Sequence, residues 1–227
     1  MANTHRYGFR WVRSYSGNES PQTITVPVPS AQAFTTGTAC NLNIGDPVRI
    51  VETTGAVELV TAGNADTTDD VAERTTAVVW GFPQVLIGGG VRPNAFLPTG
   101  TVYGTAMAPT NLQTLVTLVP VLGNIFEIDC SAAPGATFDT LAEWQTLVTQ
   151  TLDFTYSVLG AATNNPKANP LALFSSRSVA TAAFRQLRVL GVGSLGNAID
   201  YTASNVTLQV EFNQITQNRL GAGSDGS

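Results

Sequence analysis

A chain of 227 residues can bury a sizeable hydrophobic core without disulfides or metal ions. Only 12% of its residues are charged, against about 25% in typical soluble proteins. Its surface therefore interacts with water mainly through hydroxyl and amide groups, or it is covered by another protein. Lys167 is the only lysine, which favours a surface covered by protein, because lysine is depleted at protein interfaces. The formal net charge of −5 argues against a general nucleic-acid binder.

The first thirty residues are irregular, aromatic and basic. If this segment is extended, Phe9, Trp11 and Arg13 lie on one side of it, with Arg10 and Val12 on the other. A free tail would not normally expose Trp and Phe, so the segment is either the first strand of the core or an arm that buries itself on a neighbour. We predict an arm over residues 1–30 that binds a partner through Arg6, Phe9, Arg10, Trp11 and Arg13.

Short strands follow the arm. Thr23–Val28 is predicted to be an edge strand, because Pro27 has no N–H to donate to the hydrogen bonds of a central strand. Val48–Ile50 and Val57–Leu59 alternate apolar and polar residues around a break at Gly55, which predicts a hairpin. Ala77–Phe82 is apolar throughout and predicts a buried central strand.

The middle of the chain alternates between loops and strands. Residues 61–76 are polar and 84–104 are rich in Gly and Pro, so both are expected to be mostly loop, although 101–106 could begin a strand. Leu115–Leu122 and Asn124–Cys130 are two strand candidates joined at Gly123.

One helix is expected, over Thr140–Gln150 with Asp139 as N-cap, because apolar residues recur there at three- and four-residue spacing. Further strands are expected at Phe154–Leu159, Phe184–Val192 and Val206–Ile215. In the last of these, Val206, Leu208, Val210 and Phe212 alternate with polar residues, which predicts one buried face. The sequence therefore predicts a mainly all-β single domain, a β-sandwich or barrel-like fold over residues 31–218, with one short helix and a flexible tail at 219–227.

Cys40 and Cys130 are ninety residues apart and lack metal-ligand spacing, so we expect two buried thiols, with a disulfide as the alternative. The first residues do not show the basic-then-apolar pattern of a signal peptide, and no apolar run approaches the roughly 18 residues that a membrane-spanning helix needs. We expect synthesis in the cytoplasm and no membrane partner.

No motif with catalytic or cofactor chemistry is convincing. Gly191–Gly196 matches GxGxxG, but a turn and a strand follow where a dinucleotide site needs a helix. His5 is the only histidine, so a Ser-His-Asp triad is not expected. Asp69, Asp70 and Glu73 lack calcium-loop spacing, which favours a solvated loop. Glu127 and Asp129 share one face of a strand, which we interpret as a polar outer face.

Several short motifs occur in a fixed order along the chain. They are YGFRWVRS at 7–14 after MAN, IGDPVRIV at 44–51, VVWGF at 78–82, NIFEID at 124–129, RVLG at 188–191, and VEFN at 210–213 after Asn205. In order and spacing they resemble a family of tailed-phage head proteins, the small capsid cement or decoration proteins. The chain departs from that pattern in the loops between Pro83 and Pro98 and in the helix near Trp144.

The resemblance implies a virion structural protein without catalysis, cofactor or metal. Such proteins bind the major capsid protein on the outside of a filled head, often as homotrimers, with the homodimer as the alternative, and stabilise the capsid lattice. Two other classes stay open: a different virion part such as a head-fibre or tail protein, and a glycan-binding or hydrolytic module on the particle.

Overall fold

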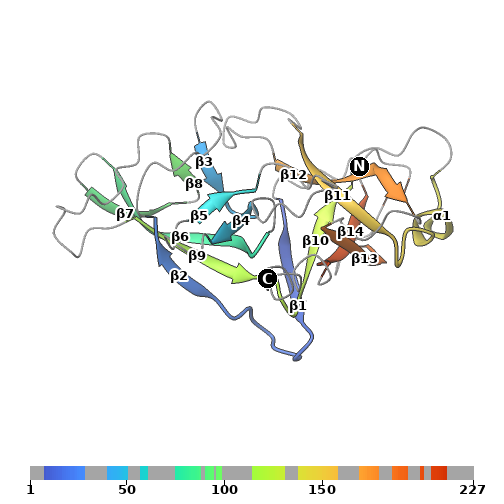
Figure 1. The fold of residues 1–227 in the computed structure, drawn as a ribbon, viewed down its shortest axis with the longest axis horizontal. Helices are drawn as coiled ribbons and strands as arrows, with labels where there is room; N and C mark the ends of the chain where they lie inside the picture. Colours follow the sequence, from blue (N-terminus) through green and yellow to red (C-terminus); the bar gives the residue numbers. More distant parts are fainter. Residues whose placement is uncertain are drawn as a thin grey trace, which may run out of the picture.

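Two antiparallel six-stranded sheets and a two-stranded ribbon organise the chain in the computed structural model (Figure 1). The structure describes residues 8–28, 40–50, 57–60, 75–87, 90–94, 96–98, 114–130, 138–157, 169–178, 186–193, 200–201 and 206–213. The predicted fold class is confirmed, since the chain is mainly β with one short helix in this part. No helix within these ranges is long and apolar enough to cross a membrane.

Sheet A joins strands from both ends of the sequence, in the order β1-β10-β14-β13-β11-β12. Its strands are β1 Arg10–Ser14, β10 Asn124–Asp129, β14 Thr207–Phe212, β13 Leu187–Val192, β11 Thr151–Ser157 and β12 Asn169–Ser178. In β14 the predicted alternation is confirmed, because Leu208, Val210 and Phe212 enter the core while Glu211 lies on the opposite face. β12 was not predicted from the sequence.

Sheet B has the order β2-β9-β6-β4-β5, with β7 also pairing with β6. Its strands are β2 Ile24–Pro27, β9 Leu115–Pro120, β6 Ala77–Ile87, β4 Pro47–Ile50, β5 Val57–Leu59 and β7 Gly90–Asn94. A separate ribbon pairs β3 Cys40–Asn43 with β8 Phe96–Pro98. The predicted β4–β5 hairpin, the edge strand β2 and the central strand β6 are all confirmed.

One prediction about a connecting segment is wrong. Residues 84–104 were expected to be loop, but β6 continues to Ile87 and β7 and β8 follow. The strand can pass through Pro83 because its pairing with β9 is interrupted between Gly81 and Gln84. The two strands predicted on either side of Gly123 are confirmed as β9 and β10, but they do not pair with each other, since β9 lies in sheet B and β10 in sheet A.

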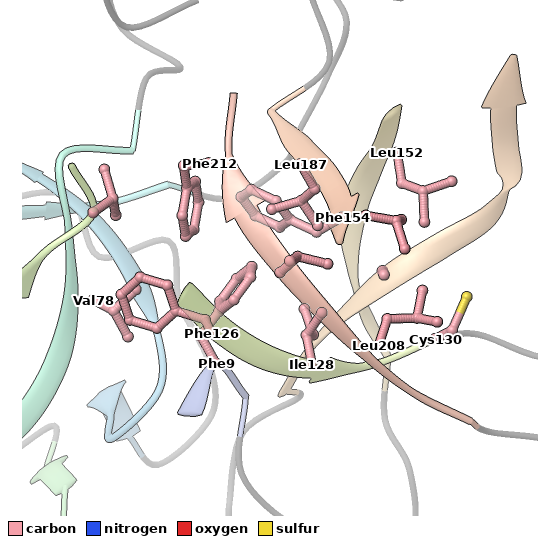
Figure 2. Close-up of a cluster of buried hydrophobic side chains, with 14 of the residues drawn as sticks. Phe9, Val78, Phe126, Ile128, Cys130, Leu152, Phe154, Leu187, Leu208 and Phe212 are labelled. Carbon is pink, nitrogen blue, oxygen red and sulfur yellow. The ribbon is translucent and has the colours of Figure 1, made fainter. Parts of the chain in front are cut away.

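The buried apolar side chains of the described residues form two clusters. The larger one fills one face of sheet A, and Figure 2 shows Phe9, Phe126, Phe154 and Phe212 within it. Phe9 meets the rings of Phe126 and Phe154 edge-on, a favourable geometry for aromatic pairs. The smaller cluster lies between sheet B and the β3–β8 ribbon, which contributes Leu42 and Leu97.

Sheet B contributes to the larger cluster as well. Val60, Val78, Val119 and Val121 belong to it, so this end of sheet B packs against the apolar side chains of sheet A. In Figure 1 sheet B lies on the left and sheet A on the right of the molecule, with β1 at the edge of sheet A that is nearer to sheet B. The start of β6 is therefore buried on both faces, as its unbroken apolar sequence predicted.

Close glycine packing joins β1 to sheet B. The Phe9 N–H donates to the Gly45 carbonyl oxygen at 2.9 Å, and the Gly45 N–H donates to the Val79 carbonyl oxygen at 2.8 Å. Gly45 has φ +88°, and a Cβ there would lie 2.9 Å from the Gly8 nitrogen. Only glycine combines that conformation with so close an approach of two backbones.

The N-terminal segment is therefore not an arm over residues 8–28, which corrects the prediction. β1 pairs with β10 as an edge strand of sheet A, and Phe9 is only 2% exposed within the core. The segment then supplies β2 to the edge of sheet B. Its Phe and Trp stabilise the chain's own fold, which was the alternative interpretation of the same residues. The predicted tail at 219–227 lies outside the described residues.

The helix α1 is shorter than predicted, Leu141–Gln145, and begins one residue later. Thr140, not Asp139, is the N-cap, in a capping box with Glu143. Hydrogen bonds from the Asp139 backbone, and then from Thr140, lower the pKa of the Glu143 carboxyl. Trp144 anchors the helix in the larger cluster, where Cys130 is also buried, as expected for this cysteine. The side chain of Cys40 lies outside the described residues.

Candidate functional site

The second face of sheet A carries polar and charged side chains, and we call it the polar face. It is defined by the polar residues of β1, β10, β14 and β13 that alternate with the core: Arg10, Arg13, Glu127, Asp129, Thr207, Gln209, Glu211 and Arg188. Strand pairing brings these residues together from positions that are up to two hundred residues apart in the sequence. This face is the candidate functional surface.

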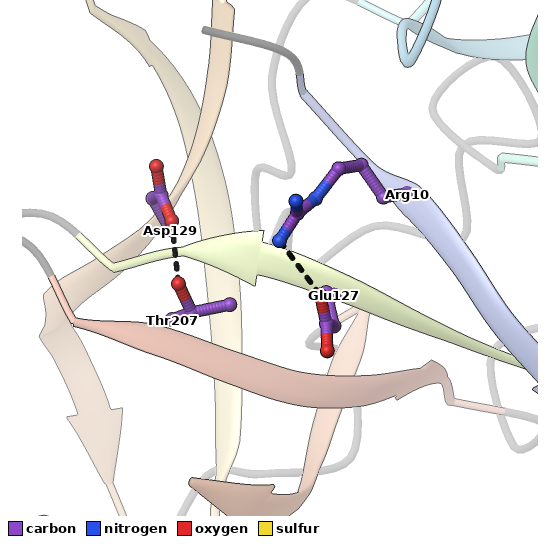
Figure 3. A network of polar contacts seen from close by, with 4 residues as sticks. All are labelled: Arg10, Glu127, Asp129 and Thr207. Carbon is purple, nitrogen blue, oxygen red and sulfur yellow. Dashed lines mark hydrogen bonds and ion pairs between the residues drawn. The ribbon is translucent and has the colours of Figure 1, made fainter. Parts of the chain in front are cut away.

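One end of the polar face is buried. Arg10 donates from Nη2 to Glu127 Oε2 at 2.6 Å, and Thr207 donates from Oγ1 to Asp129 Oδ1 at 2.9 Å (Figure 3). Glu127 and Asp129 are 5% and 4% exposed, which corrects the expectation of an exposed outer face. Carboxylates can be buried this deeply because they are hydrogen-bonded, Glu127 to a guanidinium and Asp129 to a hydroxyl.

The other end of the polar face is open to solvent. Tyr15, just after β1, donates from its hydroxyl to Glu211 Oε2 at 2.5 Å, and Arg188 lies 3.4 Å from the other carboxylate oxygen. The Tyr15 side chain is 58% exposed and that of Arg188 is 51% exposed. Partial burial, and then the hydrogen bond and negative charge of Glu211, raise the pKa of Tyr15 to about 12.

Backbone contacts fix the position of Tyr15. Its N–H donates to the Gly123 carbonyl oxygen at 2.9 Å, which sets it beside the turn between β9 and β10. Leu122 in that turn is 62% exposed, the most exposed large apolar side chain in the described part of the chain. Arg13 is also exposed, and its charge acts on the Tyr15 hydroxyl. We call Arg13, Tyr15, Leu122, Arg188 and Glu211 the Tyr15 patch.

The five residues predicted to bind a partner have different positions. Arg6 lies outside the described residues. Phe9 is in the core, Arg10 pairs with Glu127, and the Trp11 indole N–H donates to Asn124 Oδ1 at 2.8 Å. Of the four that the structure describes, only Arg13 is exposed. It pairs with Ile125, on the face opposite Phe9 and Trp11, because the β1–β10 register shifts at Val12.

The other members of the Tyr15 patch were not predicted. A signal for Tyr15 was present, because Ser16-Gly17-Asn18 directly after it is typical of a turn and leaves an aromatic residue at a strand end. The contact of Tyr15 with Glu211 spans 196 residues and depends on strand order. Single-sequence patterns do not contain that information.

The described residues bring together no group of three His, Cys, Asp or Glu side chains that could hold a metal ion. His5, Asp69, Asp70 and Glu73 lie outside them, as does the second half of the Gly191–Gly196 motif. The exposed end of the polar face offers arginine, tyrosine and leucine side chains around the Glu211 carboxylate.

Comparisons with models of known protein families, with curated proteins and with solved structures found no match to this chain.

Proposed function

We propose that this chain is a structural protein of a tailed-phage virion that binds the outside of the filled head and stabilises the lattice of the major capsid protein. It acts without catalysis or cofactor, and as a homotrimer or homodimer. The proposal rests on the motif resemblance and on a charge-poor composition that suits a surface covered by other proteins.

The observation that carries the proposal is the spatial arrangement of the resembling motifs. Four of them, FRWVRS, NIFEID, VEFN and RVLG, lie in the consecutive neighbours β1, β10, β14 and β13. The other two, in β4 and β6, are paired in sheet B. The hydrogen bonds from Phe9 to Gly45 and from Gly45 to Val79 join the two groups. Motifs scattered in the sequence thus form one continuous unit, which favours a common fold over chance matches.

The mechanism would be thermodynamic. A protein that binds only the assembled, expanded lattice stabilises that state by mass action. Attachment of an oligomer to several capsid subunits at once would raise the effective affinity further, without any stronger single contact. The polar face of sheet A is the described surface that could make such contacts, because its exposed end carries Tyr and Arg side chains.

The test uses heads assembled without this protein. The purified full-length chain is added to them, and saturable co-sedimentation together with a higher disruption temperature of the heads is expected. Added density on the capsid exterior in electron micrographs would identify the site. Association with tails or fibres instead of heads would overturn the proposal, as would binding to a glycan array with no binding to heads.

A further inference from the structure

We propose that the Tyr15 patch is the docking surface for an acidic segment of a partner protein. This inference rests on the proposed function in naming the major capsid protein as that partner. The patch itself is defined by its own contacts and can be tested without heads.

The composition of the patch is that of a protein interface. Tyr and Arg are enriched among the residues that carry most binding energy, and aromatic rings add large contact area at low entropic cost. Tyr15 and Leu122 are the two most exposed large apolar side chains in the described residues, and the Tyr15–Gly123 hydrogen bond places them beside the same turn.

The charge of the patch indicates the chemistry of the partner. Arg13 and Arg188 provide two positive charges against the single negative charge of Glu211, whereas the whole chain carries −5. A local positive surface on an acidic protein attracts an acidic partner segment and orients it during encounter. A nucleic acid would feel the same local attraction but would be repelled by the net charge of the molecule.

The patch is ordered before any partner binds. Glu211 holds the Tyr15 hydroxyl on one side and Arg188 on the other. The turn that follows Tyr15 is closed by the Gly17 N–H to the Ser14 carbonyl oxygen at 3.2 Å and by the Asn18 N–H to Ser14 Oγ at 3.1 Å. Side chains that are already positioned lose less entropy on binding, so this geometry favours affinity.

The first experiment compares binding of variants to heads that lack the protein. Tyr15→Ala should weaken binding about tenfold or more, as expected for an interface tyrosine. Tyr15→Phe keeps the ring but loses the bond to Glu211, and should weaken binding less. Arg13→Glu should weaken binding, and raising the salt concentration should weaken binding of the wild type, because salt screens exposed charges.

Two variants on sheet B serve as matched controls. Trp80→Ala removes another exposed aromatic ring, and Arg92→Glu reverses another exposed arginine, on β6 and β7 respectively. Both should bind heads like the wild type. If Tyr15→Ala and Arg13→Glu bind no more weakly than these controls, the inference is overturned while the proposed function stands.

A second experiment needs no heads. Amide chemical shifts of the full chain are recorded by NMR with poly-L-glutamate, with poly-L-lysine and with a thymidine oligonucleotide. Shift changes centred on Arg13, Tyr15 and Arg188 with poly-L-glutamate alone would support the inference, even if the wild type fails to bind heads and the proposed function falls. No change at these residues, a stronger response to the oligonucleotide, or self-association that covers the patch would each overturn it.

Discussion

The two faces of sheet A are made by the same strands, yet their side chains are exposed to solvent to very different degrees. On the apolar face, Phe9, Phe126 and Phe212 pack ring against ring and are nearly inaccessible to water. On the polar face, burial decreases along the sheet, from the Asp129–Thr207 pair to the exposed end at Tyr15 and Arg188.

This difference suggests that the apolar face mainly determines the stability of the fold and that the exposed end of the polar face is available for binding. Strand β1 contributes to both, because Phe9 and Trp11 pack toward the core while Arg10 and Arg13 lie on the polar face. Changes on the apolar face should therefore act on folding, and changes at the exposed end of the polar face should act on binding. Each experiment below changes one side of this comparison.

The largest effect is expected from deleting residues 1–13. The deletion removes Phe9 from the larger cluster and takes most of β1 away from β10. Truncating one buried Phe alone costs about 3–5 kcal/mol, and a whole domain is stable by only about 5–15 kcal/mol. The shortened chain should lose its cooperative thermal transition by circular dichroism, whereas deletion of residues 1–7 keeps every described contact and serves as the control. Cooperative unfolding of the shortened chain at an unchanged temperature would restore the interpretation as an arm.

A smaller effect is expected at the junction between β1 and sheet B. Gly45→Ala combines strain at φ +88° with a Cβ only 2.9 Å from the Gly8 nitrogen. Left-handed backbone costs a non-glycine residue about 1–2 kcal/mol, and overpacking adds about 1–3 kcal/mol. Gly123→Ala is the matched control, because its φ is +74° and a Cβ there meets nothing within 4 Å. Urea unfolding should show Gly45→Ala to be clearly less stable than Gly123→Ala, and equal losses would mean that the close approach contributes nothing.

The gradient of burial along the polar face can be tested with its two ion pairs. Arg10–Glu127 is 2.6 Å long with Glu127 almost fully buried, whereas Arg188–Glu211 is 3.4 Å long and more exposed. A double-mutant cycle in urea should give a coupling of about 1–2 kcal/mol for the first pair and below about 0.5 kcal/mol for the second. A larger coupling energy for Arg188–Glu211 than for Arg10–Glu127 would contradict the conclusion that Arg10–Glu127 is the more buried pair.

Much of this fold could be predicted from local patterns, because alternation and glycine or proline breaks are encoded within a few residues. The β4–β5 hairpin, the central strand β6 and the buried face of β14 are examples. The partners of strands could not be predicted, since β9 and β10 are adjacent in the sequence but belong to different sheets.

The candidate site was predicted only at Arg13, for two physical reasons. Aromatic and arginine side chains suit a core strand and an interface equally well, so composition alone could not separate the two interpretations of β1. A one-residue shift at Val12 then moved Arg13 to the face opposite Trp11. The residues that join Arg13 there, Arg188 and Glu211, come from the far end of the chain.

The smallest effect concerns the proton on Tyr15, at the exposed end of the polar face. The folded chain holds this proton up to about pH 12, whereas the unfolded chain releases it near the ordinary pKa of 10.0. The stability linked to Tyr15 is therefore complete below pH 10.0 and is lost as the pH rises toward 12. Ultraviolet titration should show a late-ionising tyrosine that disappears in Tyr15→Phe. Glu211→Gln should keep that tyrosine but lower its pKa, because burial remains while the carboxylate's hydrogen bond and charge are lost. An unchanged titration in Tyr15→Phe would mean that Glu211 does not hold the Tyr15 hydroxyl in solution, and the patch would then lack the order that its binding role requires.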